Sequence, residues 1–209
     1  MRNIYLLRHC ETERSKRKKC IGRTEVRLSE NGIRQAQCLK RYFDEKNLSG
    51  IFCSDAIRSA ETAEIISGGI IPIQKLAGLR EIDMGDWDGM YFDEIKAKFP
   101  DEYRQRGLDF ASFSPPHGES FTACQKRAEM IFRDISAKPH GDIAIVSHAG
   151  FNRALICSLC RIDLQKLFTI PQPFGCVNFL SLEDGVCIVR KTGVEVMEDN
   201  NSDRIGAIK

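Results

Sequence analysis

Short apolar runs alternate along this chain with segments in which apolar residues recur every three or four positions. Runs typical of buried strands lie at residues 4–7, 51–53, 70–73 and 143–146, each bounded by polar or turn-forming residues. The intervening segments have the periodicity of amphipathic helices. This alternation predicts a three-layer α/β/α fold, with a mostly parallel central sheet and helices on both faces.

Two helices carry the clearest signals, because each follows a serine suited to the N-cap position. The helix after Ser29 is expected to bury Ile33, Ala36, Leu39 and Phe43. The helix after Ser120 is expected to bury Phe121, Cys124, Ala128, Ile131 and Ile135.

Three further elements follow from turn and capping residues. Ser54 and Asp55 are expected to supply the turn and the cap before a helix at about 57–66, which ends at a Ser-Gly-Gly segment. A helix is expected at about 150–159. The runs 176–182 and 186–190 predict a closing hairpin around the turn at 183–185.

The segment at about 84–118 is less regular and is interpreted as a lid-like insertion in a single domain spanning 1–209. A glycine-rich turn at 84–89 precedes a helix at 92–99, and Pro100 is expected to begin a loop. Its aromatic residues suit either contact with a ring-bearing substrate or a secondary core. They are Trp87, Tyr91, Phe92, Phe99, Tyr103, Phe110 and Phe113.

Composition indicates an ordinary globular protein, with 209 residues, 42% hydrophobic residues, 29% charged residues and a net charge of +2. The densest basic cluster, residues 14–19, is short and lacks interleaved aromatics, so it is interpreted as a solvated loop. We therefore expect no nucleic-acid partner, although the cluster has room to attract anionic substrates. No long apolar segment indicates a membrane partner, and no pattern indicates the oligomeric state.

Nine cysteines, an odd number in a chain of this size, favour reduced thiols and a cytoplasmic location over a disulfide framework. Cys157 and Cys160 have the spacing of a metal motif, but they lie in an apolar helical stretch with no second ligand pair nearby. We expect no metal site.

Candidate chemistry lies at the ends of two expected strands. Arg8 and His9 follow the run 4–7, and His148 follows the run 143–146. Because ligand sites form at the carboxyl ends of strands in α/β sheets, both imidazoles are expected to share one pocket with Arg8. Imidazole is a competent nucleophile and a cation at slightly acid pH, and arginine binds phosphate oxygens in pairs. Taken singly, each histidine is better explained as a packed or capping residue, and their joint placement is what favours the chemistry.

Arg58 follows the strand at 51–53 and begins the next helix, whose backbone N–H groups would favour an anion. A phosphoryl group in transfer spreads its charge over three oxygens, so several fixed cations suit it. Alone, Arg58 would be an ordinary arginine on a helix surface.

These motifs resemble those of the histidine phosphatase superfamily, the phosphoglycerate-mutase-like clan. The resemblance begins with Leu7-Arg8-His9-Cys10-Glu11-Thr12 and extends through most of the chain to about Phe179. It continues with the segments 28–36, 54–62, 80–89, 117–120 and Ser147-His148-Ala149-Gly150.

The resemblance implies roles for individual residues. His9 would be phosphorylated, while Arg8, Arg58 and His148 would bind the phosphoryl group, and Glu81 would act as general acid and then as general base. The N–H group of Ala149 would face the phosphate. Thr12, Gly22 and Arg23 would contribute to substrate binding. No metal or other cofactor would be required, because the arginines and His148 supply positive charge.

Two residues depart from the family pattern. Cys10 and Ala149 stand where the family usually has glycine. The side chain of Cys10 is expected either to crowd the phosphate site or to be a passive buried residue, and a thiol beside a cationic pocket would be redox-sensitive.

The expected reaction is hydrolysis of a phosphomonoester, because the interval between Glu81 and His148 is shorter than the insertion associated with the mutases. The segments 22–24 and 173–178 look most like the bacterial phosphatase branch, with a small-metabolite substrate such as alpha-ribazole phosphate. A bisphosphoglycerate-dependent phosphoglycerate mutase and a non-enzymatic phosphate-binding module remain the alternatives.

Overall fold

Six strands form one mixed sheet in the computed structural model, which describes residues 1–13, 17–138 and 141–196. Its order is β3-β2-β4-β1-β5-β6, and the first four of these strands are parallel. β5 and β6 add an antiparallel hairpin at one edge. The strands are β1 (Arg2–Arg8), β2 (Leu48–Cys53), β3 (Ile73–Lys75), β4 (Asp142–Ser147), β5 (Val177–Glu183) and β6 (Val186–Val194). The expected mostly parallel α/β sheet is confirmed.

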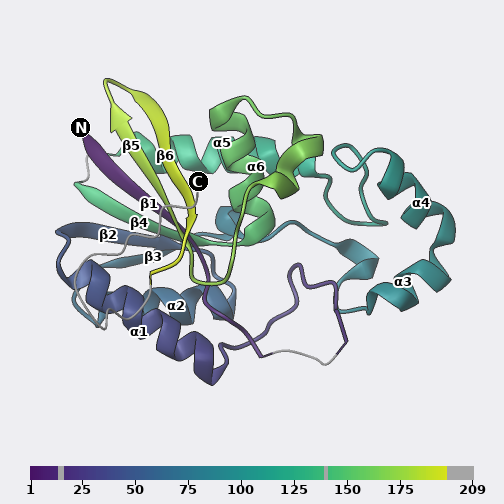
Figure 1. Ribbon diagram of the computed structural model, residues 1–209, viewed down its shortest axis with the longest axis horizontal. Coiled ribbons are helices and arrows are strands. Elements are labelled where there is room, and N and C mark those ends of the chain that lie inside the picture. Colours follow the sequence, from purple (N-terminus) through teal and green to yellow (C-terminus); the bar gives the residue numbers. More distant parts are fainter. Residues whose placement is uncertain (14–16, 139–140, 197–209) are drawn as a thin grey trace.

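Helices cover both faces of this sheet (Figure 1). α1 and α2 lie on one face, α5 and α6 lie on the other, and α3 and α4 stand away from the sheet in the insertion. Their bounds are α1 (Glu30–Asp44), α2 (Ile57–Ser67), α3 (Phe92–Lys98), α4 (Pro100–Leu108), α5 (Phe121–Ser136) and α6 (Ala149–Cys160). Short 3-10 helices occupy Ala77–Leu79, Gly85–Trp87 and Leu164–Thr169.

Alternating residues of the central strands build two hydrophobic cores. In β1, Ile4 and Leu6 pack in the cluster that includes residues of α5 and α6, whereas Tyr5 and Leu7 pack in the cluster that includes residues of α1 and α2. Successive side chains of a strand point to opposite faces, so a strand covered on both faces reads as one continuous apolar run. This explains why β1 and β4 were recognisable from their sequences.

Both serine caps are confirmed. The Ser29 hydroxyl oxygen accepts the N–H of Gly32 at 3.0 Å, and that of Ser120 accepts the N–H of Ala123 at 3.1 Å. The expected buried faces were partly wrong. Ile33 is 42% exposed, and Gly32 faces inward instead, against the Glu11 backbone, where a Cβ would lie 1.9 Å from the carbonyl oxygen.

The buried face expected for α5 was also partly wrong. Phe132 is buried with Cys124, Ala128 and Ile135, whereas Phe121 and Ile131 are only partly buried. The edge strand β3 is also displaced from the expected run 70–73 to Ile73–Lys75, because the chain still turns after the left-handed Gly68 and Gly69.

The cap of α2 differs from the expected one. The Ser54 hydroxyl accepts the N–H of Ala56 in the turn, but the first helical N–H, that of Ile57, is bonded to the carboxylate of Glu25 at 2.8 Å. Asp55 instead binds the guanidinium of Arg80 through two hydrogen bonds of 2.6 Å. The cap is therefore supplied by a distant segment.

The insertion contains a helix that was expected to be a loop. Pro100 occupies the first turn of α4, a position that tolerates proline because its N–H would be unpaired in any helix. Trp87 is fully buried against Phe99, Tyr103 and Phe113, with ring centroids 5.4–6.3 Å away. Most of the aromatic residues therefore form a small core of their own.

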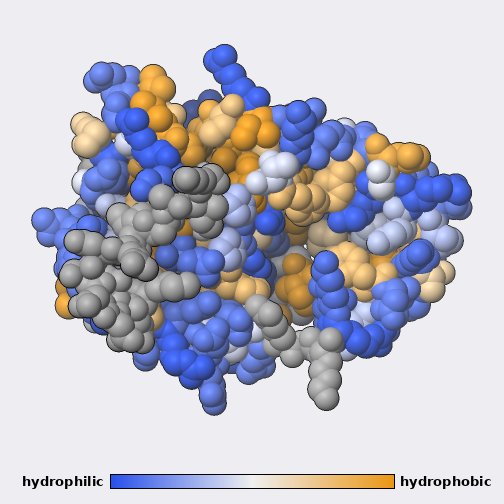
Figure 2. Space-filling model, in the orientation of Figure 1, coloured by the Kyte–Doolittle hydropathy of each residue, from blue (hydrophilic) through white to orange (hydrophobic). Residues whose placement is uncertain are grey.

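Apolar residues reach the surface beside a hollow between the body of the molecule and the insertion (Figure 2). Among the helices of the described residues, none has the length and apolar character needed to cross a membrane.

Candidate active site

His9 and His148 lie side by side because their strands are neighbours. β1 and β4 are parallel and pair Arg8 with Ser147, so each histidine is the next residue beyond the last pair. The His9 N–H donates to the Ser147 carbonyl at 2.9 Å, and the ring centroids are 5.2 Å apart. Both side chains are buried. The two imidazoles that the apolar runs were expected to bring together are therefore adjacent.

The hydrogen bond of His9 defines its tautomer. Its Nδ1 lies 2.8 Å from the carbonyl oxygen of Cys10, and a carbonyl only accepts, so Nδ1 carries the ring proton. Nε2 then holds a lone pair. Burial, followed by the charges of Arg58 and Arg8, lowers the pKa of His9 well below its usual value. At neutral pH this imidazole is therefore an uncharged nucleophile.

His148 is neutral for similar reasons. Burial, followed by the charge of Arg58 and then that of Arg8, lowers its pKa well below the usual value. The positive charge of the site thus comes from the arginines, and the expectation that His148 supplies charge needs correction. Neither ring nitrogen of His148 has a hydrogen-bond partner among the described residues, so a neutral ring N–H is available to an anion.

Arg58 is a buried, fixed cation and not a helix-surface residue. Its side chain comes from the first turn of α2 and the residue is 2% exposed. Its Nη2 and Nη1 donate to the carbonyl oxygens of Gly22 at 2.7 Å and Thr24 at 2.9 Å. The N–H of Ile57, at the N-terminus of α2, is already bonded to Glu25. The positive charge that α2 brings to the site is therefore that of the Arg58 guanidinium.

Arg8 is held by a carbonyl and an aromatic ring. Its Nη1 donates to the Gln172 carbonyl at 2.6 Å, and its guanidinium carbon lies 3.7 Å from the centroid of the Phe174 ring. That ring also lies 5.6 Å from the ring of His9. The sequence reasoning gave Phe174 no role of its own, although it had singled out the segment 173–178.

The carboxylate of Glu81 lies at the N-terminus of α6, the helix that begins directly after His148. Its Oε2 accepts the N–H of Gly150, and its Oε1 accepts the N–H groups of Phe151 and Ile82, all at 3.0 Å. A side chain at position 150 would displace this carboxylate, because a Cβ would lie 2.6 Å from Oε1. Oε2 accepts one bond where Oε1 accepts two, so Oε2 keeps more of its capacity for a further hydrogen bond.

The N-terminus of α6 retains one N–H group. Gly150 and Phe151 donate to Glu81, whereas Ala149, the first helical residue, has no hydrogen-bond partner for its N–H among the described residues. Since this group follows His148, it is suited to an anion bound between the two histidines. The phosphate contact expected of Ala149 stays a prediction.

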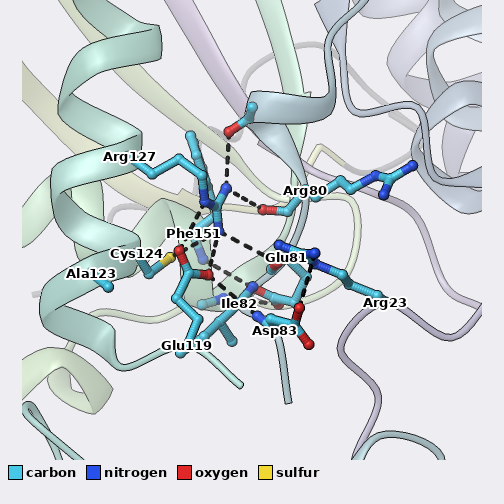
Figure 3. A network of polar contacts seen from close by, with 12 residues as sticks. Arg23, Arg80, Glu81, Ile82, Asp83, Glu119, Ala123, Cys124, Arg127 and Phe151 are labelled. Atoms are coloured by element: carbon cyan, nitrogen blue, oxygen red, sulfur yellow. Dashed lines mark hydrogen bonds and ion pairs between the residues drawn. The ribbon is translucent and has the colours of Figure 1, made fainter. Parts of the chain in front are cut away.

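Arg127 and Glu119 hold the backbone that carries Glu81, and sequence reasoning missed both roles. Figure 3 shows the Arg127 guanidinium between the Glu119 carboxylate and this backbone. Arg127 donates to Glu119 at 2.7 and 3.0 Å and to the carbonyls of Gly78 and Arg80 at 2.9 Å. The only sequence signal was the motif 117–120, which contains Glu119.

Thr12, Gly22 and Arg23 were expected to bind substrate, and the structure gives each another contact. Thr12 forms an isolated bridge with Leu28. The N–H groups of Gly22 and Arg23 both donate to Asp88, and the Arg23 guanidinium lies 2.9 Å from Asp83. Gly22 acts on the site through its carbonyl, which holds Arg58.

Cys10 occupies the hydrophobic core and not the histidine pocket. It is fully buried in the same cluster as Leu7 and Val177, and its N–H donates to the Thr62 hydroxyl at 3.1 Å. Burial raises the pKa of the thiol to about 12. A protonated, buried thiol is a weak nucleophile, so the passive interpretation is favoured over crowding and over redox sensitivity.

The described part of the basic cluster packs on the insertion; residues 14–16 lie outside the described residues. Arg17 stacks on Tyr91 at 3.8 Å and pairs with Asp93 at 2.6 Å. Within residues 1–13, 17–138 and 141–196, no group of three or more potential metal ligands is found, and all nine cysteines are free.

The α/β sheet places a neutral histidine beside a second histidine and near two held arginines, an arrangement suited to binding a phosphoryl group. The family model of the histidine phosphatase superfamily (branch 1) matches residues 4–195. The chain belongs to this superfamily and is a phosphatase of it.

Known relatives agree with this assignment. Phosphoserine phosphatase 1 of Hydrogenobacter thermophilus is 29% identical over 180 residues, which cover 85% of this chain and 83% of the relative. Adenosylcobalamin/alpha-ribazole phosphatase of Salmonella typhimurium is 26% identical over 90% of this chain and 94% of its own length. The solved structure of Bacillus stearothermophilus YhfR is 30% identical, with a TM-score of 0.84 over 92% of this chain and 97% of that chain.

Proposed function

We propose that this protein is a metal-independent phosphomonoesterase that acts through a phosphohistidine at His9. The observation that carries the proposal is the state of His9: its Nδ1 donates to the Cys10 carbonyl, which leaves the Nε2 lone pair free beside Arg8, Arg58 and His148. A fixed neutral imidazole among cations suits attack on a phosphate dianion.

In the first half of the reaction, Nε2 of His9 attacks phosphorus. The bond between phosphorus and the ester oxygen breaks as the new P–N bond forms, and Glu81 gives a proton from Oε2 to the leaving oxygen. Arg8, Arg58, a ring N–H of His148 and the Ala149 N–H bind the three remaining oxygens. Thr12, Gly22 and Arg23 complete the substrate site in this proposal.

In the second half, water attacks the phosphohistidine. The Glu81 carboxylate takes one proton from this water, the P–N bond breaks, and inorganic phosphate leaves with His9 regenerated. Glu81 then carries the proton that the next cycle requires. Metal ions are unnecessary because the guanidinium groups neutralise the phosphoryl charge, and we propose no other cofactor.

We propose a small phosphorylated metabolite as substrate, with alpha-ribazole phosphate as the first choice. The name of the Salmonella typhimurium relative supports this choice, and the name of the Hydrogenobacter thermophilus relative makes phosphoserine the second candidate. The proposal includes one domain spanning 1–209, no nucleic-acid partner, and a cytoplasmic location, which nine unpaired cysteines support.

The test is a panel of phosphomonoesters hydrolysed in the presence of a chelator, comparing kcat/KM for alpha-ribazole phosphate, phosphoserine, sugar phosphates and phosphoglycerate. His9→Ala should lower turnover by about 10³-fold or more and abolish the acid-labile phosphohistidine trapped in the native protein. The exposed His117, changed to Asn, is the matched control. Full activity of His9→Ala would refute the mechanism.

Two other outcomes would identify the alternatives. Isomer exchange of phosphoglycerate that is faster than phosphate release, with bisphosphoglycerate present, would indicate a mutase. Phosphate binding with no turnover and no phosphohistidine would indicate a binding module.

A further inference from the structure

The carboxylate of Asp88 organises the turn that holds Arg58. It accepts four hydrogen bonds from three consecutive residues: the N–H of Gly22 at 2.9 Å, of Arg23 at 2.7 Å and of Thr24 at 2.8 Å, and the Thr24 hydroxyl at 2.9 Å. Bonds to a charged acceptor are stronger than neutral ones. A single side chain therefore fixes every N–H group of this turn.

The opposite side of the same turn fixes the guanidinium. The carbonyl oxygens of Gly22 and Thr24 accept from Nη2 and Nη1 of Arg58. The Gly22 carbonyl and the Arg23 N–H belong to one planar trans peptide unit and point in opposite directions, so the bond of this N–H to Asp88 turns the carbonyl toward Arg58. The Thr24 carbonyl follows the last residue that Asp88 holds. Position 22 has no room for a side chain, because a Cβ would lie 2.7 Å from the Ile82 carbonyl oxygen.

Asp88 itself is fixed by the insertion. It follows the fully buried Trp87, and the chain after it pairs with the segment before the turn. Gly89 donates to the Cys20 carbonyl at 2.8 Å, and Cys20 donates to the Met90 carbonyl at 2.9 Å. The aromatic core of the insertion thus determines where this carboxylate lies.

We propose that Asp88 is a positioning residue for the phosphoryl group, acting through the turn at 22–24 to hold Arg58 and thereby making phosphate affinity depend on the packing of the insertion. The inference rests on the proposed function only in that Arg58 binds the phosphoryl group.

The test compares Asp88→Asn with Asp86→Asn, a change of a nearby exposed carboxylate whose partner is His117. An asparagine replaces one of the two acceptor oxygens of Asp88 with an NH₂ group, which cannot accept from the N–H groups of residues 22–24. The turn should therefore loosen. Asp88→Asn should weaken the binding of inorganic phosphate, measured by calorimetry, by about tenfold or more and lower kcat/KM similarly. Asp86→Asn should match the native protein.

A double-mutant cycle separates positioning from general destabilisation. In an Arg58→Ala background, Asp88→Asn should cause no further loss of kcat/KM, whereas a merely structural role would give additive losses. If Asp88→Asn fails to fold, Thr24→Val, which removes one of the four donors, should show a loss of about twofold to fivefold with the same non-additivity. Additive losses, or native phosphate affinity in Asp88→Asn, would overturn the inference. A native protein that neither binds phosphate nor turns over would instead refute the proposed function.

Discussion

The imidazole rings of His9 and His148 lie edge to face, with centroids 5.2 Å apart, and both are buried. Burial and the nearby guanidinium charges lower the pKa of both side chains below the ordinary value of about 6.5. The site therefore contains a neutral pair of imidazoles near the cations Arg8 and Arg58. This charge distribution determines how the protein should respond to pH.

Activity should persist at acid pH. With an ordinary pKa of about 6.5, the neutral fraction of His9 would fall by about tenfold by pH 5.5, and kcat/KM with it. Because the pKa of His9 is lowered, we expect the acid limb of kcat/KM, corrected for ionisation of the substrate, to lie below pH 6. NMR titration of the His9 ring should show no protonation between pH 8 and 6. A midpoint near 6.5 for this ring would contradict the charge arrangement.

Stability should decrease as the pH falls. In the unfolded chain His9 and His148 bind protons below about pH 6.5, whereas the folded chain keeps them neutral, so the unfolded state binds more protons there. The free energy of unfolding should then fall by about 1.4 kcal/mol per pH unit for each histidine. Urea unfolding at pH 7.5 and 5.5 should show a shallower dependence for His148→Gln than for the native protein. An unchanged slope in that variant would show that His148 is not the group responsible.

Loss of Arg127 should affect both stability and catalysis. Arg127→Met leaves Glu119, whose side chain is 14% exposed, without its ionic partner and releases the backbone of Gly78 and Arg80. We expect a stability loss of about 3 kcal/mol and a lower kcat, because Glu81 loses its support. The control is Arg104→Met, an exposed residue paired with Asp101, which should cost less than about 1 kcal/mol. Equal losses in the two variants would argue against the supporting role.

Removing the ring of Phe174 should weaken phosphate binding. The guanidinium of Arg8 lies 3.7 Å from this ring, and a cation–π contact of this kind contributes about 1 kcal/mol. Phe174→Leu should therefore raise KM by about fivefold with a smaller change in kcat. Phe168→Leu, at a 59% exposed ring, is the comparison. A native KM in Phe174→Leu would show that the Gln172 carbonyl suffices to hold Arg8.

Local signals in the sequence predicted the sheet, the serine caps and the convergence of His9 with His148. They failed where a distant contact decides the outcome. Gly32 replaced Ile33 on the buried face because of the Glu11 carbonyl, which lies in a separate segment. Proline usually interrupts a helix, but Pro100 lies in the first turn of α4. The sequence did not show where this helix begins relative to Pro100.

The supporting residues of the site were hidden for the same reason. Asp88 bonds to a turn more than 60 residues earlier, and Arg127 bonds to backbone carbonyls more than 40 residues earlier. No periodicity or spacing encodes such partners. Arg8, His9 and His148 lie at strand ends, so their convergence could be predicted from the sequence, whereas Asp88 and Arg127 are known only from the fold.

The pairing of Arg8 with Ser147 has a further consequence for how this molecule can diversify. Because adjacent parallel strands are spaced by their hydrogen bonds, the separation of the two imidazoles is inherited from the sheet and not from any loop. Segments around the mouth of the site can therefore be shortened, lengthened or exchanged while the histidine pair keeps its geometry. Substrate specificity can therefore change while the geometry of the histidine pair stays the same.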